Sequence, residues 1–240
     1  MSDLFDSIRD VKSYIEMKGF LFILKYVLRI IVYRNWLYKK YRKDWKFTFD
    51  DEKYKYFHHL YNTTWENERA VEIPIIKKIF DNYRENRILE VGNVLSHYFD
   101  LNHDVIDKYE MNPEIINMDI IDYNPQKNYE LIISISTLEH IGYDEKPRKP
   151  RKIFRVINHL KKLLASKGKM IVTIPIGYNP YLDYYLKNNL IKFDQTFFLK
   201  RISKDNRWKQ VKNINIIIDA EFGEPFPNAN GLFIGCIKKT

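Results

Sequence analysis

The sequence predicts an α/β fold in which a mostly parallel β-sheet is covered by helices on both faces. Hydrophobic residues make up 45% of the 240 residues and aromatic residues 15%, which is enough for a large core. Between residues 87 and 238, short apolar runs alternate with helical or polar connectors, a pattern typical of buried parallel strands. The chain is long enough for one such domain, with about 50 residues to spare at one end.

The first 50 residues are expected to form a basic, apolar helical extension, and residues 51–240 the α/β domain. The extension carries 11 Lys and Arg against 6 Asp and Glu, and therefore +5 of the net charge of +9. Residues 19–41 are expected to be helical, but Lys25 and Arg29 would each cost roughly 3 kcal/mol near a bilayer centre. Two interpretations remain. The helix packs on the domain or in a homodimer, or it lies in a membrane interface as a peripheral contact.

The N-terminus predicts no secretory signal, because Asp3, Asp6 and Asp10 stand where such a signal carries cations. Cys236 is the only cysteine and lies in an apolar run, where a buried structural thiol is expected. One cysteine and six scattered histidines predict no metal site and no internal disulfide. We therefore expect a cytoplasmic protein, with membrane association as an option of its extension.

The predicted elements follow one another in the order of an α/β domain. From residue 50 to residue 83 the pattern is helical, with Pro74 opening or breaking a helix. A further helix is expected over residues 152–165, with Gly168 as its C-cap. The predicted strands are 87–92, 104–107, 115–119, 129–136, 169–175, 214–220 and 231–238.

Polar residues gather where the predicted strands end. Glu90 and Gly92 end the first strand, Asp107 the second and Asp119 the third. In a doubly wound sheet, ligands bind outside the carboxyl ends of the strands. A carboxylate after the second strand is placed to accept hydrogen bonds from both hydroxyls of a ribose, and a glycine lets the backbone approach a ligand closely. The order of these residues therefore predicts a site for a ligand that carries a ribose.

These segments resemble the successive motifs of class I S-adenosylmethionine-dependent methyltransferases. The resemblance rests on Ile88-Leu-Glu-Val-Gly92, Asp107, Asn117-Met-Asp119, Tyr129-Glu-Leu-Ile-Ile-Ser-Ile-Ser-Thr-Leu-Glu-His140 and the run from Leu163 to Pro175. It covers residues 87–178 and extends more loosely to the C-terminus, where the family adds a reversed hairpin. It implies a Rossmann-like methyltransferase fold with a seven-stranded, mostly parallel sheet, and S-adenosyl-L-methionine as cofactor.

The resemblance also implies a role for each matching residue. Glu90 and Gly92 would lie beside the methionine and ribose of the cofactor, Asp107 would bind the ribose hydroxyls, and Asp119 the adenine amine. The implied cofactor-binding residues are Glu90, Gly92, Asn93, Asp107, Asp119, Ile120, Ser136 and Leu138. The candidate catalytic residues are His140, which would face the methyl-transfer pocket, and its neighbours Tyr143 and Asp144.

The leading hypothesis is O-methylation of a small molecule or glycan, including a sugar-nucleotide. Transfer to a hydroxyl is assisted by a general base, and histidine exchanges protons near neutral pH, which suits His140 to this role. The fourth strand lacks the Asn/Asp-Pro-Pro-Tyr/Phe motif of the family's nucleic-acid amine methylators, so nucleic acid is not favoured. The basic loop Lys146–Lys152 near the site either meets a phosphate or is simply solvated.

The first loop departs from the family's pattern, because Gly92, Val94 and Ser96 stand where the family alternates three glycines. The stretch from Gly92 to Asp107 is also short, so its helix is expected to be stunted. These departures support an alternative: a degenerate Rossmann-like binding module without catalysis, docked to a membrane or partner through its N-terminal helix. A dinucleotide-dependent oxidoreductase is disfavoured, since no Gly-x-Gly-x-x-Gly motif occurs.

Overall fold

The computed structural model describes residues 24–25, 28, 32, 38 and 40–239. The chain divides into two compact units, residues 1–45 and 46–240. Most of the predicted helix 19–41 lies outside the described residues, so its packing stays a prediction. In the described part of the chain, every helix is too short or too polar to cross a membrane.

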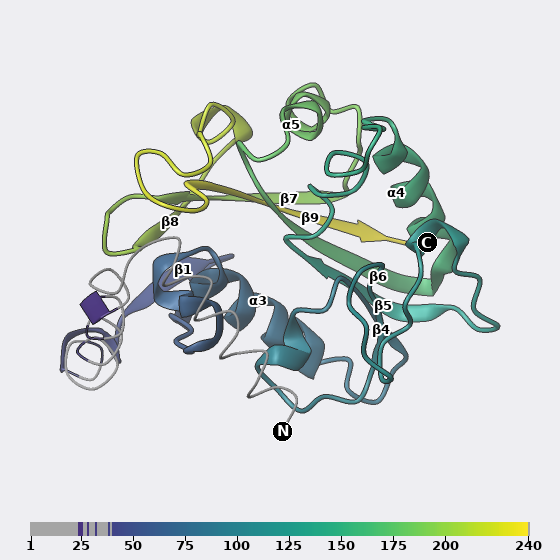
Figure 1. Ribbon diagram of the computed structural model, residues 1–240, viewed down its shortest axis with the longest axis horizontal. Helices are drawn as coiled ribbons and strands as arrows, with labels where there is room; N and C mark the ends of the chain where they lie inside the picture. The colour runs from purple at the N-terminus through teal and green to yellow at the C-terminus, as the bar shows by residue number, and fades with distance from the viewer. Residues whose placement is uncertain (1–23, 26–27, 29–31, 33–37, 39, 240) are drawn as a thin grey trace. The chain divides into compact units, whose positions relative to one another are not determined.

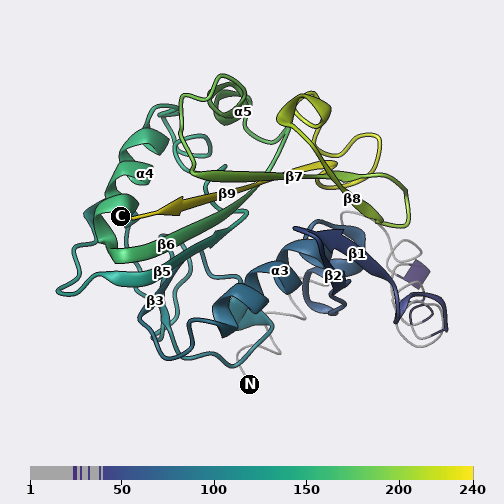
Figure 2. The ribbon, with the colours of Figure 1, turned by 180° about the vertical axis from the view of Figure 1, so that it is seen from behind.

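Within residues 46–239, seven strands form one sheet in the order β4-β3-β5-β6-β9-β7-β8 (Figures 1 and 2). The strands are β3 (Ile88–Val91), β4 (Asp104–Ile106), β5 (Tyr129–Ile135), β6 (Leu164–Pro175), β7 (Gln195–Arg201), β8 (Trp208–Val211) and β9 (Gly231–Lys238). Strands β4, β3, β5 and β6 pair in parallel, whereas β9 pairs antiparallel with both β6 and β7. This arrangement confirms the predicted Rossmann-like α/β fold with a reversed strand at the C-terminus.

Helices cover both faces of this sheet (Figures 1 and 2). They are α3 (Arg69–Asp81), α4 (Lys152–Leu163) and α5 (Pro180–Lys187), accompanied by a hairpin of β1 (Lys46–Phe49) and β2 (Glu52–Lys55). Helices α4 and α5 share one apolar core with Ile132 and Val172. Helix α3 and strand β1 share the other core with Ile133 and Ile171. Adjacent strand residues point to opposite faces, so the apolar runs of β5 and β6 supply both cores.

The hairpin occupies residues 46–55, part of which the sequence predicted to be helical. That prediction was wrong, because it missed the alternation that buries Phe47 and Phe49 in the α3 core and exposes Lys46 and Thr48. Asp50 and Asp51 form the turn at φ angles of 50° and 60°, which aspartate tolerates better than most residues.

Helix α3 continues through Pro74, which the sequence predicted to open or break it. A proline has no N–H to bond the carbonyl four residues earlier in a helix. Here that carbonyl belongs to Ala70, and it accepts a hydrogen bond from the backbone N–H of Phe57 at 2.8 Å. The Ala70 carbonyl therefore keeps a hydrogen-bond partner, and the helix extends to Asp81.

The predicted third strand, residues 115–119, is reduced to a single parallel bridge between Ile106 and Ile116. The amide of Asn117 donates to the backbone carbonyls of Asp107, Lys108 and Glu110, each at 3.1 Å. These bonds wrap the loop after β4 around Asn117. The segment therefore remains a connector and does not extend along β4.

The predictions of a strand at 214–220 and of Gly168 as a helix C-cap were also wrong. Segment 214–220 contains a 3-10 turn, since the N–H groups of Ile217 and Ile218 bond back to the carbonyl of Ile214, and the strand beside β9 is β7 instead. Gly168 lies inside β6 and does not cap α4, because α4 ends at Leu163 and β6 begins at the next residue.

Candidate functional site

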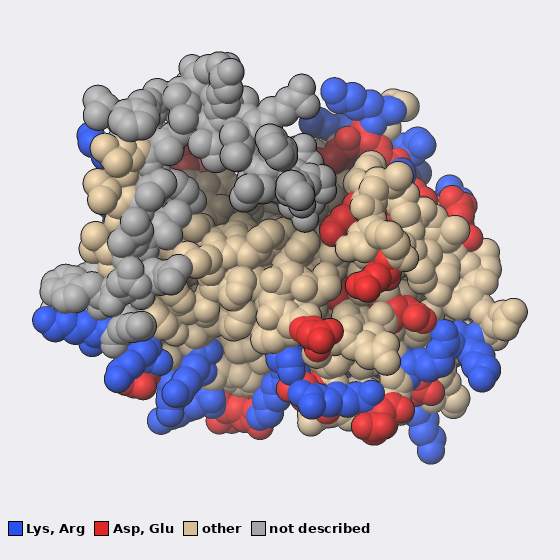
Figure 3. Space-filling model, turned by 60° about the horizontal axis from the view of Figure 1, so that its bottom comes forward, with Lys and Arg blue, Asp and Glu red and all other residues tan. Residues whose placement is uncertain are grey.

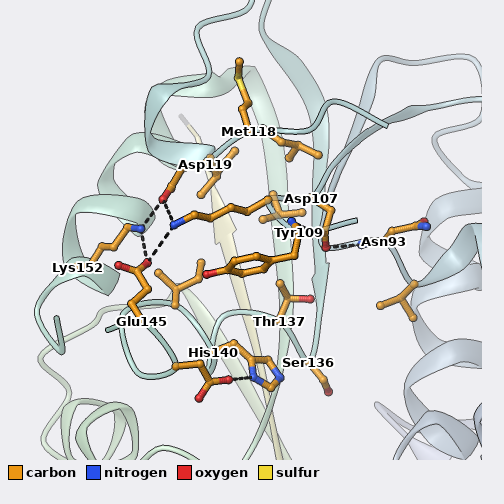
Figure 4. A pocket seen from close by; sticks show the side chains of 18 residues that line it. Asn93, Asp107, Tyr109, Met118, Asp119, Ser136, Thr137, His140, Glu145 and Lys152 are labelled. Atoms are coloured by element: carbon orange, nitrogen blue, oxygen red, sulfur yellow. Dashed lines mark hydrogen bonds and ion pairs between the residues drawn. The ribbon is translucent and has the colours of Figure 1, made fainter. Parts of the chain in front are cut away.

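A pocket of about 340 Å³ opens at the carboxyl ends of β3, β4 and β5 (Figure 4). The predicted cofactor-binding residues that line it are Gly92, Asn93, Asp107, Asp119, Ile120 and Ser136, and the predicted catalytic residues that line it are His140 and Asp144. Glu90, Leu138 and Tyr143 are not among the lining residues. Leu138 is fully buried in the core between the sheet and α4, and Tyr143 packs edge-on against Tyr178.

Glu90 has a fully buried side chain, which binds the backbone of the first loop. Its Oε1 accepts hydrogen bonds from the backbone N–H groups of Val94 and Leu95, both at 2.9 Å. Its Oε2 lies 2.7 Å from Nε2 of His103, which is buried as well. The carboxylate is turned towards the loop backbone, which is why it does not line the pocket. The loop contains only a short 3-10 turn, Leu95–His97, in agreement with the stunted helix that the sequence predicted.

Gly92 brings the first loop close to the end of β5. Its φ is 85°, and a Cβ at this position would lie 2.1 Å from Oγ1 of Thr137. Both the backbone angle and the contact require glycine here. Gly92 therefore lets the first loop lie directly against Thr137 at the end of β5.

Asp107 uses one carboxylate oxygen for the turn after β4. Oδ1 accepts from the backbone N–H groups of Tyr109 at 2.7 Å and Glu110 at 2.9 Å. Oδ2 has one long contact among the described residues, with the backbone N–H of Asn93 at 3.4 Å. Because the carboxylate lines the pocket, Oδ2 is placed to accept hydrogen bonds from a ligand.

Four alternating charges close one end of the pocket (Figure 4). Asp119 Oδ2 accepts from Lys108 at 3.1 Å and from Lys152, and Glu145 Oε1 also accepts from Lys152. Burial opposes ionisation of Asp119, but the hydrogen bonds from Lys152 and Lys108 outweigh it and lower the pKa of this carboxyl. The hydrogen bond to Asp119 raises the pKa of Lys108. All four groups are therefore held in their charged forms.

His140 lies on the side of the pocket next to Glu145 and belongs to a hydrogen-bonded group of three side chains. Its Nδ1 lies 2.6 Å from Oδ2 of Asp144 (Figure 4), and the hydroxyl of Tyr178 donates to the same oxygen at 3.0 Å. Burial and the hydrogen bond to Asp144 raise the pKa of Tyr178 to about 12, so its hydroxyl stays protonated. With Nδ1–H donating to Asp144, Nε2 is the ring atom left to accept a proton.

Buried carboxyl groups lie behind the pocket. Ser136 has a φ of 41°, and its hydroxyl donates to Glu72 Oε1 at 2.5 Å. Glu139 is 2% exposed, and its Oε1 lies 3.7 Å from Nε2 of His140. Burial raises the pKa of Glu139 well above its usual range, which favours the neutral acid. The Nε2 side of His140 is thus bordered by a carboxyl group that holds its proton.

Asp183 supports the loop that carries Tyr178. It lies in the first turn of α5, where its Oδ2 accepts from the backbone N–H of Gly177 at 2.9 Å. Its Oδ1 is buried without a hydrogen-bond partner among the described residues. Burial raises the pKa of Asp183 from 3.8 to about 7.

Asp183→Asn is expected to remove a pH dependence of stability. The folded chain binds the Asp183 proton more tightly than the unfolded chain does, so its contribution to stability is complete below pH 4 and is lost as the pH rises towards 7. Within that window the loss is about 1.4 kcal/mol per pH unit. Urea unfolding at several pH values should show that the free energy of unfolding of the variant increases relative to that of the wild type as the pH rises. The exposed Asp100→Asn serves as control, and a difference independent of pH would contradict the expectation.

Sequence reasoning missed several residues of the site. Tyr109, which is 71% exposed, lies across the middle of the pocket in Figure 4. Lys108 and Lys152 both form ion pairs with Asp119 at the charged end of the pocket. The sequence signal of Tyr109 is its position, because it is an aromatic residue just after Asp107 at the end of a strand. Glu72 precedes Ser136 by 64 residues and carries no local signal of its role.

No protein-family model matches the chain, and no curated protein matches it in sequence. Solved structures that it is similar to include an S-adenosylmethionine-dependent methyltransferase from Archaeoglobus fulgidus, at 11% identity over 75% of this chain and 98% of that one, with a TM-score of 0.44. Another is the N-methyltransferase NodS from Bradyrhizobium japonicum with S-adenosyl-L-homocysteine, at 11% identity over 72% and 91% of the two chains, with a TM-score of 0.38. A methyltransferase from Clostridium acetobutylicum has 12% identity over 69% and 89%, with a TM-score of 0.35.

Proposed function

We propose that this chain is an S-adenosylmethionine-dependent methyltransferase that methylates a hydroxyl of a small molecule, glycan or sugar-nucleotide. One observation carries the proposal. A single pocket is lined by the Gly92 loop, the Asp107 carboxylate and the His140–Asp144 pair. A nucleoside and a general base can thus be held within one hollow.

The pocket fits the parts of the cofactor. Ile106, Met118 and Ile120 offer an apolar wall for adenine, and the exposed ring of Tyr109 can stack on it. Asp107 Oδ2 suits the ribose hydroxyls, and the backbone of Gly92 lines the pocket where the chain beyond the ribose would lie. Asp119 lines the same wall, but a bond from its carboxylate to the adenine amine would compete with the lysines that it already binds.

The proposed reaction is an in-line displacement, for which bound S-adenosylmethionine would supply the methyl group of its sulfonium. The sulfur–methyl bond would break and S-adenosylhomocysteine would leave. His140 Nε2 accepts the proton of the acceptor hydroxyl as the new oxygen–carbon bond forms. Asp144 holds the imidazole through Nδ1 and stabilises the imidazolium, as a third group does in other base-assisted sites. Tyr178 donates to the same Asp144 oxygen and keeps that carboxylate in place.

Charge in the α/β domain supports a small acceptor over nucleic acid. On the face shown in Figure 3, the Lys and Arg side chains of the described residues lie beside Asp and Glu along the rim. Nucleic-acid binding draws on clustered, unbalanced positive charge. Mixed positive and negative charges of this kind are typical of a surface that contacts solvent.

Calorimetry with S-adenosylmethionine and S-adenosylhomocysteine tests the proposal, and Asp107→Ala should weaken both interactions. Loss of hydrogen bonds to a charged group is expected to cost about 1.5–3 kcal/mol, or roughly a 10- to 150-fold higher Kd. Asp107→Asn keeps an oxygen for the Tyr109 and Glu110 N–H groups and should lose less. Asp100→Ala, an exposed carboxylate outside the pocket, is the matched control.

Unchanged affinity in a folded Asp107→Ala protein would contradict the assignment of Asp107. If the full-length wild type binds neither compound, the alternative of a degenerate binding module is favoured. That module would act through residues 1–50, which we propose to position the protein on a membrane surface or in a homodimer and to take no part in the chemistry. Co-sedimentation with anionic vesicles at low and high salt distinguishes these two settings, because screening weakens contacts of Lys and Arg with lipid.

A further inference from the structure

A second hollow lies beside the cofactor pocket. It is a groove of about 790 Å³ between the start of α4, the loop before it and α5. Its lining includes Lys149, Arg151, Arg155, Tyr181 and Tyr185. Asp119 and Lys152 line both the groove and the pocket, so the two hollows adjoin.

Positive charge is in excess in the groove, whose lining holds four cations and two carboxylates: Lys149, Arg151, Lys152, Arg155, Asp119 and Asp122. Arg151 and Arg155 are four residues apart at the start of α4 and therefore share one side of the helix. Both are exposed, and no carboxylate of the described residues forms an ion pair with either. Lys152 already binds two carboxylates, and Lys149 has one at 3.7 Å. The two guanidinium groups are thus the cations free to bind an anion.

The loop between the hollows is held firmly. The backbone N–H of Lys149 donates to the carbonyl of Gly142 at 2.6 Å, and Glu145 is tied to Lys152. Gly142 has a φ of 72°, and a Cβ there would lie 2.2 Å from the Lys149 carbonyl oxygen. One side of this loop therefore faces the pocket through Glu145 and the other faces the groove through Lys149.

A series of aromatic contacts leads from His140 to the groove. The ring centroids of His140 and Tyr178 are 4.6 Å apart, those of Tyr178 and Tyr143 5.9 Å, and those of Tyr143 and Tyr181 6.4 Å. Tyr185, one turn after Tyr181 on α5, packs on Phe154 of α4 at 4.6 Å. The groove thus has flat aromatic walls and begins near the proposed methyl-transfer end of the pocket.

We propose that this groove binds the diphosphate of a nucleotide-linked acceptor. Guanidinium groups match phosphate oxygens in a bidentate geometry, and tyrosine rings offer a surface for a nucleotide base. A sugar attached to this diphosphate would extend past Tyr143 towards His140, with the base on Tyr181. The assignment of the acceptor rests on the proposed function, but the binding of the anion does not.

Calorimetry on the full-length protein, saturated with S-adenosylhomocysteine, tests the groove with inorganic pyrophosphate and uridine diphosphate. Arg151→Ala/Arg155→Ala should weaken both ligands by roughly 10- to 100-fold, the range for lost hydrogen bonds to charged groups. Lys161→Ala/Lys162→Ala removes the same charge at the far end of α4 and should change little. Tyr181→Ala should weaken uridine diphosphate but not pyrophosphate.

Equal affinity in the arginine double variant and the wild type would overturn the proposal, and so would an equal loss in the lysine double variant. Titrations without S-adenosylhomocysteine separate the two ideas. Pyrophosphate bound by the arginines in a chain that binds no S-adenosylhomocysteine would refute the methyltransferase and keep the groove. Cofactor binding without any pyrophosphate binding would refute the groove alone.

Discussion

His140→Ala is expected to lower turnover by about 10²–10⁴-fold, the usual contribution of a general base. Its Nδ1 is held by Asp144, so the variant loses the ring atom that takes the proton of the acceptor hydroxyl. Affinity for S-adenosylmethionine should be nearly unchanged, because the proposed cofactor contacts come from Asp107 and the Gly92 loop and not from His140. The measurement is the release of S-adenosylhomocysteine with the best acceptor from a panel of nucleotide-linked sugars and free glycans.

Two neighbours sharpen this test. Asp144→Ala should reduce turnover less than His140→Ala, because it removes the group that orients the imidazole and leaves the base itself. Tyr143→Phe keeps the packing against Tyr178 and Tyr181 and removes only a hydroxyl, so it shows whether Tyr143 takes part in the chemistry. Full turnover in a folded His140→Ala protein would leave His140 with a structural role.

Glu90→Ala should be the most destabilising single change at the site. It leaves the N–H groups of Val94 and Leu95 and the buried ring of His103 without their partner. An unsatisfied buried group costs about 1–3 kcal/mol, so three together imply at least about 3 kcal/mol. For a chain of this size that is a fall in Tm of roughly 6–12 °C. Thermal unfolding measures it directly.

Glu90→Gln is the matched control, because its side-chain oxygen still accepts from both N–H groups and its amide can donate to His103. The loop that presents Gly92 and Asn93 depends on these bonds, so Glu90→Ala should also bind S-adenosylhomocysteine more weakly at temperatures where it remains folded. A Glu90→Ala protein with wild-type Tm would show that the loop does not depend on the carboxylate.

Pattern alone was sufficient for the strands that the sheet buries on both faces. The runs 87–92, 129–136 and 169–175 are rich in Ile, Leu and Val, which is the composition of strands that are covered on both sides. Pattern was insufficient where the local structure depended on a short alternation of buried and exposed residues or on the hydrogen bonds of one side chain. The hairpin 46–55 was hidden in a helical-looking region, and residues 115–119 form a connector held by Asn117.

The sequence by itself determined the fold class and placed Gly92, Asp107 and His140 after strand ends, because chain direction brings the ends of parallel strands to one edge. Only the tertiary structure decided where each side chain points. Glu90 turns to its own loop, and Asp119 is bound by two lysines. Ser136 bonds to Glu72, 64 residues away, and Tyr178 to Asp144, 34 residues away. Such partners meet through packing of separate elements, and no local pattern encodes a contact between residues so far apart in the chain.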